Sequence, residues 1–103
     1  MAQQSALTES TYYILLSLVK ARHGYGIMQR TAELSGGRIQ LAAGTLYGAL
    51  NAMVDKGWIT LLPGEGRKKD YRLTPLGLEV LRKELARLRE LVASGDLVMK
   101  EEA

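Results

Sequence analysis

The chain has 103 residues, enough for one domain but not for a second core of ordinary size. Its hydrophobic fraction of 47% and charged fraction of 24% are typical of a folded globular protein. Cysteine is absent and there is one histidine, which excludes disulfides, thiolate metal sites and sites built from several histidines. No run approaches the roughly 20 apolar residues of a membrane span, and the first residues do not resemble a signal peptide. We therefore expect a cytoplasmic protein without metal or cofactor.

The net charge of +3 is unevenly distributed along the chain. Residues 1–72 hold nine Lys or Arg against five Asp or Glu, whereas residues 73–103 hold five against six. A basic front followed by a balanced back favours a polyanionic partner. A similar excess is also common on unrelated surfaces.

Two helices are predicted in the first third of the chain. Thr8 and Glu9 have the character of a helix start, a capping hydroxyl followed by an acid in the first turn. The helix that follows, through residues 12–19, is apolar nearly all round, so more than one of its faces must be covered. In a domain this small we expect part of that cover to come from a second subunit. Residues 23–26 interrupt the pattern, and a second helix is predicted over about residues 26–34.

A third helix is predicted over about residues 43–56, with Gly57 as its stop signal. Apolar residues at positions i, i+4, i+7 and i+8 form its buried stripe. They are Leu46, Leu50, Met53 and Val54. Small and hydrogen-bonding residues lie on or beside the opposite face, namely Gly44, Thr45, Tyr47, Gly48 and Asn51. Such a face suits close approach to another surface, whereas a merely solvated face is usually rich in Lys and Glu.

A hairpin is predicted next, from a strand at residues 58–62, a turn at 63–66 and a return strand at 67–74. Its basic tip consists of Arg67, Lys68 and Lys69. We assign Trp58 and Tyr71 mainly to the core beneath the hairpin. Three helices followed by such a hairpin predict a mainly α (α+β) fold, a winged helix-turn-helix. A hairpin that only improves solubility is the alternative reading of the basic run.

The last helix is predicted to begin at Thr74 and Pro75, a capping hydroxyl and a residue suited to the first helical position. Apolar residues then repeat at spacings of 3 and 4, as in a coiled coil of about two heptads. They are Leu78, Leu81, Leu85, Leu88 and Val92. Charged residues including Glu84 and Arg87 surround this seam, and Ser94 and Gly95 are predicted to end the helix.

We expect this last helix to form a dimer interface together with Tyr12 and Leu16 of the first helix. The alternative is that it packs only on its own domain. The chain is accordingly divided into a winged-helix part, residues 1–74, and a dimerisation helix with a tail, residues 75–103.

Four groups of residues occur in a distinctive order and spacing: residues 23–27, residues 44–47 followed by Leu50, residues 56–59, and residues 67–69 with 71–77. In this order they resemble the PadR family of bacterial regulators, specifically its short members, over about residues 7–92. Ala43 and Gly48 depart from the pattern, because family members often have Pro at these places.

The resemblance implies a dimeric transcription regulator, usually a repressor, that binds double-stranded DNA. The third helix would enter the major groove. Thr45 and Tyr47 would reach phosphate or base edges, and Asn51 could read an adenine. The residues of the basic tip would contact phosphates or the minor groove, and Tyr25 either contacts the DNA backbone or packs. A symmetric dimer would favour a palindromic operator with half-sites about 34–36 Å apart.

Some short family members bind flat aromatic drugs between their subunits. Here the corresponding residues would be Tyr13, Ser17, Leu85 and Leu88, for which simple dimer packing is the ordinary reading. His23 is expected to play a structural role in its turn.

Two other classes of protein are the alternatives to a DNA-binding regulator. An enzyme is disfavoured by the residue inventory, which lacks cysteine, a phosphate-binding loop and paired carboxylates in an apolar setting. A winged helix used for protein or RNA contact is the second alternative, because fold does not fix function.

Overall fold

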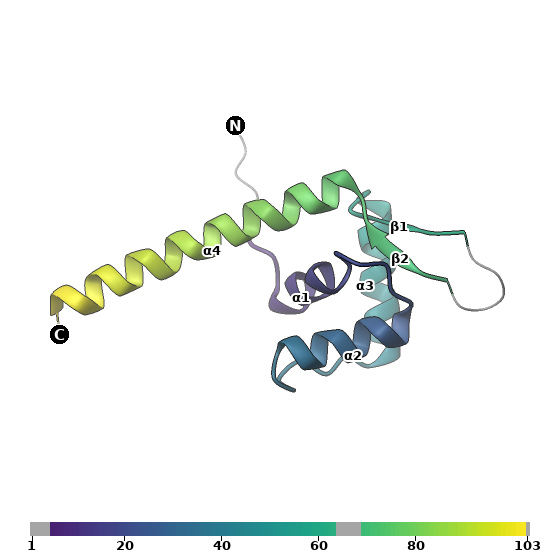
Figure 1. Cartoon of the computed structure of the whole chain (residues 1–103), viewed down its shortest axis with the longest axis horizontal. Helices are drawn as coiled ribbons and strands as arrows, with labels where there is room; N and C mark the ends of the chain where they lie inside the picture. The colour runs from purple at the N-terminus through teal and green to yellow at the C-terminus, as the bar shows by residue number, and fades with distance from the viewer. Residues whose placement is uncertain (1–4, 64–68, 103) are drawn as a thin grey trace.

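The structure is a computed structural model that describes residues 5–63 and 69–102. The elements follow in the order α1 (Glu9–Ser17), α2 (Gly24–Leu34), α3 (Ala43–Asp55), β1 (Ile59–Leu61), β2 (Tyr71–Leu73) and α4 (Pro75–Glu102). Figure 1 shows the first three helices gathered beside the hairpin, and α4 running away from them. The predicted winged-helix arrangement is confirmed.

The first two helices begin at side-chain caps. Thr8 accepts a hydrogen bond from the amide of Thr11 through its hydroxyl, as predicted for the start of α1. His23 caps α2, because its Nδ1 accepts from the amide of Gly26 at 3.2 Å. This cap explains why α2 begins at Gly24 rather than at the predicted residue 26. The single histidine therefore has the structural role that was expected of it.

The core lies where α1, α2 and α3 meet the hairpin and the first half of α4. It consists of Ile14, Leu15, Leu18, Ile27, Leu46, Leu50, Met53, Ile59, Tyr71, Val80 and Leu81. The stripe predicted for α3 supplies three of these residues, and the fourth member, Val54, is partly buried. Gly57 follows α3 with a φ of 76°, a conformation that favours glycine and ends the helix.

The two strands pair antiparallel, with Ile59 opposite Leu73 and Leu61 opposite Tyr71. They are shorter than the predicted strands. Arg22, in the connection between α1 and α2, adds a bridge to Tyr71, with an N–O distance of 3.0 Å one way and 2.8 Å the other. The base of the hairpin is thereby joined to the start of α2.

The helix α4 begins as predicted, since the Thr74 hydroxyl accepts from the amide of Gly77 at 3.0 Å. Its predicted end was wrong: α4 continues through Ser94 and Gly95 to Glu102. Gly95 does not have a positive φ and so sits in the helix, unlike Gly57. A single glycine costs only about 1 kcal/mol in a helix interior, and Ala93 and Leu97, both good helix formers, lie two residues away on either side.

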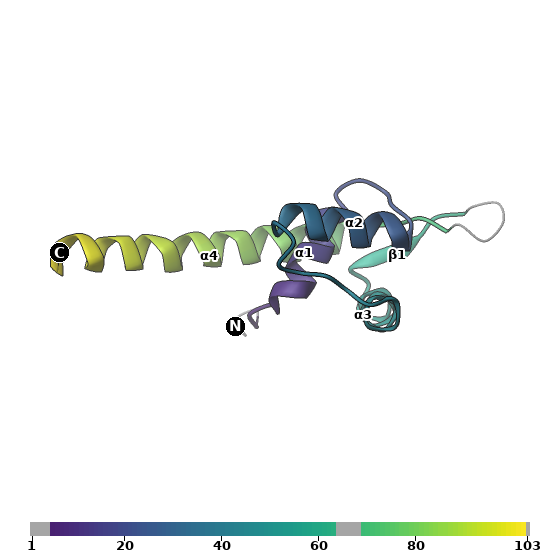
Figure 2. The same ribbon diagram turned by 90° about the horizontal axis from the view of Figure 1, so that it is seen from below.

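The molecule is elongated because α4 extends beyond the core. Its principal extents are 58 × 35 × 20 Å. Figures 1 and 2 both show the C-terminal part of α4 leaving the other elements on the side opposite to the hairpin. Every residue from Arg89 to Glu102 is exposed in the single chain. Within the described residues, no helix is both long and apolar enough to cross a membrane.

Candidate nucleic-acid interface

One face of α3 is exposed along its N-terminal two-thirds. The residues predicted to contact DNA from this helix, Gly44, Thr45, Tyr47, Gly48 and Asn51, are all exposed in the structure. The opposite face is held in the core by Leu46, Leu50 and Met53. Ala42, the N-cap residue, has no polar side chain, so the first-turn amides of α3 keep donors for an external acceptor. The structure therefore places the five residues on one accessible surface.

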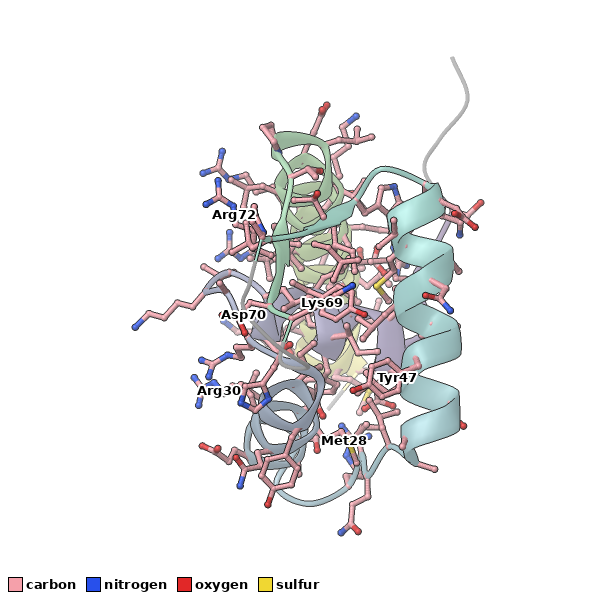
Figure 3. All side chains as sticks on the ribbon, turned by 90° about the vertical axis from the view of Figure 1, so that its right-hand side faces the viewer. Met28, Arg30, Tyr47, Lys69, Asp70 and Arg72 are labelled. Atoms are coloured by element: carbon pink, nitrogen blue, oxygen red, sulfur yellow. The ribbon has the colours of Figure 1, made fainter. Side chains whose placement is uncertain are left out.

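Tyr47 differs from its neighbours on this surface because part of its ring is covered. Its exposed fraction is 46%, and its ring lies against Gly24 at the first turn of α2. Figure 3, seen from the hairpin end of the molecule, shows Tyr47 extending from α3 toward the side on which α2 lies. Burial raises the pKa of the Tyr71 hydroxyl, and the neighbouring Tyr47 raises it further. Tyr47 thus lies near both α2 and the base of the hairpin.

Tyr25 is 63% exposed and stands at the start of α2. Its ring stacks on His23, with the ring centres 6.4 Å apart and the planes 10° from parallel. Its hydroxyl accepts from the side-chain amide of Gln29 at 3.3 Å. Tyr25 is therefore a surface residue with local support rather than part of the core, which leaves its hydroxyl accessible to a partner.

The basic tip of the hairpin is described only in part. Arg67 and Lys68 lie outside the described residues, whereas Lys69 is described and exposed. Arg72, the last cation of the same run, lies in β2 opposite Thr60 and borders a hollow formed with Leu73 and Pro75. Figure 3 shows Arg72 on the side away from α3. Lys69 and Arg72, the two described cations of this run, therefore lie on different sides of the hairpin (Figure 3).

The residues predicted for a dimer interface separate into two groups. Tyr12, Leu85, Leu88 and Val92 line one hollow of about 430 Å³ between α1 and α4. The others do not join them. Leu81 belongs to the core, Leu16 packs partly against that core, and Leu78 borders the hollow at Pro75. Only the first group offers a continuous surface to a second subunit.

The residues predicted for an aromatic effector are also not brought together. Ser17 is buried, and its hydroxyl donates to the carbonyl of Ile14 at 2.6 Å. In the single chain Ser17 therefore presents no surface to an effector. The Tyr13 hydroxyl accepts from Arg38 at 3.4 Å, apart from the hollow that Leu85 and Leu88 line.

Glu84 is a buried acid that sequence reasoning placed among the surface charges. Its carboxylate accepts from Arg87 at 2.6 and 2.9 Å and from the amide of Leu7 at 2.8 Å. The hydrogen bonds from Arg87 lower the pKa of Glu84 below its ordinary value, with help from the Leu7 amide and against the opposing effect of burial. The segment before α1 is thus tied to α4. A charge pattern alone could not reveal this, because Glu84 occupies an ordinary flanking position of the seam.

Comparison with known proteins places this arrangement in a family. The model of the Transcriptional regulator PadR-like family matches residues 14–83. An uncharacterised protein X from Lysinibacillus sphaericus is 34% identical over 92 residues, which are 82% of this chain and 82% of that protein. An uncharacterised 37.1 kDa protein in transposon Tn4556 of Streptomyces fradiae is 40% identical over 62 residues, 60% of this chain but only 17% of that protein.

Solved structures agree with this match. Bacillus subtilis PadR in complex with operator DNA is 31% identical with a TM-score of 0.62, over 73% of this chain and 45% of that one. A complex structure of RosR from H. salinarum is 30% identical with a TM-score of 0.72, over 93% and 86%. A PadR family regulator from Clostridium difficile is 23% identical with a TM-score of 0.68, over 86% and 97%, and it supports the fold alone.

Proposed function

Because the chain belongs to the PadR-like family of transcriptional regulators, we propose that it acts as a homodimer and represses transcription by binding a palindromic operator. Members of this family are transcription regulators rather than enzymes. The proposal concerns the finer points: how this chain contacts DNA, how two copies assemble, and the direction of regulation.

The exposed face of α3 carries the proposal. An α-helix with small residues on its outer face can lie deep in the major groove, where side chains reach base edges. Gly44 and Gly48 have open space where a Cβ would stand, so neither is required by packing within the chain. Their small size is explained if another surface must approach closely. Thr45 and Asn51 then supply the hydrogen-bonding groups of this face.

The hairpin supplies the second contact. Lys69 is exposed, and Arg67 and Lys68 precede it in the sequence. Such cations bind phosphate and release counterions, so the affinity falls with salt in proportion to the number of phosphates neutralised. The Bacillus subtilis PadR protein, whose structure was solved in complex with operator DNA, has the same fold. This similarity supports DNA as the polyanionic partner.

Two copies would associate through the hollow lined by Tyr12, Leu85, Leu88 and Val92. Val92 and Met99 are exposed apolar residues of α4, and a second copy that covers them would remove this surface from water. Residues 75–103 would then serve as the dimerisation helix and residues 1–74 as the DNA-binding part. The two-fold symmetry of such a dimer predicts a palindromic operator.

Footprinting on the DNA upstream of its own gene tests the proposal. We expect protection of a palindromic site, and the double variant Lys68→Ala, Lys69→Ala should bind it more weakly with a lower salt slope, by about one unit for each lost phosphate contact. Lys83→Ala with Lys100→Ala is the matched control, since it removes two lysines from α4. An unchanged affinity and salt slope would remove the hairpin from the mechanism. Absence of any footprint would favour the alternative, a module for protein or RNA contact.

An aromatic effector between subunits remains a further hypothesis. Of the residues predicted for this effector, Leu85 and Leu88 line the hollow together with Tyr12, whereas Ser17 is buried. Titration with planar dyes tests it: dye binding should weaken the interaction with DNA. A protein that binds no dye would not be regulated in this way.

A further inference from the structure

Gly24 is the first residue of α2, and it is buried beneath the ring of Tyr47. A Cβ at position 24 would lie 2.9 Å from the Tyr47 Cζ and closer still to its hydroxyl oxygen. Carbon atoms of real side chains do not approach this closely, so any other residue at position 24 would have to displace something. The contact joins α2 to α3, the helix proposed to read DNA.

The colliding group is the far end of a side chain that is itself nearly half exposed. Its ring can swing into solvent at little cost to the core, because Tyr47 belongs neither to the core cluster nor to the partly buried residues packed against it. Replacing Gly24 would therefore move the Tyr47 hydroxyl without unfolding the domain. Alanine is also a better helix former than glycine, so the substitution does not weaken α2 itself.

Tyr47 also stands beside the base of the hairpin. After burial, Tyr47 is the second cause that raises the pKa of Tyr71. Tyr71 in turn pairs with Arg22, two residues before Gly24. The ring therefore lies where α2, α3 and the hairpin meet. The position of the ring determines where the hydroxyl of this half-exposed side chain can donate a hydrogen bond.

We propose that Gly24 is a positioning residue for DNA binding: the absence of its Cβ gives the Tyr47 ring a fixed place against α2, from which the hydroxyl reaches the DNA backbone. This rests on the proposed function, because the effect is expressed in DNA affinity. Gly24 then affects DNA binding only through the position of Tyr47.

The test compares Gly24→Ala with Gly26→Ala on the duplex protected in the footprint. Gly26 lies in the same helical turn, but a Cβ there would be 3.6 Å from the nearest atom, an ordinary contact. A hydrogen bond to a charged group contributes about 1.5–3 kcal/mol, so we expect Gly24→Ala to weaken operator binding roughly tenfold or more. Gly26→Ala should change the dissociation constant less than about threefold. The melting temperatures of the two variants should be close.

A double-mutant cycle shows whether the effect passes through Tyr47. In a Tyr47→Ala background the space at position 24 is free, so Gly24→Ala should then have no further effect on affinity. Tyr47→Phe should lose as much affinity as Gly24→Ala, because both remove a correctly placed hydroxyl.

Three results would overturn the proposal. The first is equal operator affinity of the Gly24→Ala and Gly26→Ala proteins. The second is a Gly24→Ala substitution that lowers the affinity equally with and without Tyr47. The third is a Gly24→Ala protein that melts far below the Gly26→Ala protein. The last would show that the contact serves folding. A wild-type chain that binds no DNA would instead contradict the proposed function, which is seen before any substitution is made.

Discussion

At the scale of single residues, Glu84 is the one charged residue that is buried in the described part of the chain. The residue is 1% exposed, and its carboxylate accepts three hydrogen bonds, two from Arg87 and one from the amide of Leu7. A buried carboxylate is tolerated only when such donors compensate for the water it has lost. The arrangement joins the segment before α1 to the middle of α4, at the boundary between the winged-helix part and the projecting helix.

Glu84→Gln should therefore destabilise the protein by about 1.5–3 kcal/mol, the value of a charge-assisted hydrogen bond. Chemical denaturation measures this difference. Glu79→Gln is the matched control on the same helix: Glu79 forms an exposed pair with Lys83 at 3.1 Å, and loss of such a pair costs only about 0.3–0.5 kcal/mol. Equal effects of the two substitutions would show that the Glu84 hydrogen bonds contribute nothing beyond a surface pair.

The stability of the wild-type chain should also depend on pH through Glu84. Its pKa is lower in the folded protein than its ordinary value of 4.5, so its contribution is complete above pH 4.5. The contribution is lost as the pH falls further, through the lower pKa of the folded state. The difference in stability between wild type and Glu84→Gln should accordingly shrink below pH 4.5. A difference that stays constant down to the acid transition would argue against this assignment.

At the scale of elements, two glycines of α4 have opposite surroundings. A Cβ at Gly77 would lie 2.8 Å from the carbonyl carbon of Trp58, a backbone atom that cannot swing aside. A Cβ at Gly95 would meet nothing within 4 Å. The first glycine lets the start of α4 pack against the backbone of Trp58, directly before β1, whereas the second has no such role within the chain.

Gly77→Ala should lower the free energy of unfolding by about 1–3 kcal/mol, the usual cost of overpacking. Gly95→Ala should raise it by about 0.5–1 kcal/mol in the helix interior. Thermal or denaturant unfolding of the two variants checks both signs. A Gly77→Ala protein as stable as the wild type would mean that α4 can shift away from Trp58 freely.

The elements differ in how well the sequence predicts them. The buried stripe of α3 and its exposed opposite face could be predicted, because helical periodicity alone separates them. The end of α4 could not, since the sequence does not show whether Gly95 adopts a helical or a left-handed conformation. The strands came out shorter than expected, because alternation does not show how far pairing extends.

The candidate site shows the same division. The exposure of Thr45 and Asn51 follows from a local pattern, whereas the contact between Gly24 and Tyr47 joins residues that are distant in the chain. The burial of Ser17 could not be predicted for a similar reason: on a helix that is apolar nearly all round, the sequence does not show which side faces the core. Tertiary packing decides these questions, and a single sequence carries little information on it.

At the scale of the whole molecule, α4 extends well beyond the core and carries exposed apolar residues. Leu88 borders the hollow with Tyr12 and Val92, whereas Leu97 is exposed nine residues farther along. At 3.6 residues per turn, nine residues place Leu97 on the opposite side of the helix from Leu88. If two copies associate through the hollow, the two leucines should respond differently to the same substitution.

Leu88→Glu should dissociate the dimer, because it places a charge in an apolar interface. Operator affinity should fall with it, since each half-site would then be bound by a separate chain. Leu97→Glu should leave both properties close to those of the wild type. Sedimentation measures the assembly, and DNA binding over a range of protein concentrations measures the consequence. Dissociation by Leu97→Glu but not by Leu88→Glu would place the interface on the other face of α4, so that the hollow at Tyr12 would need a different partner.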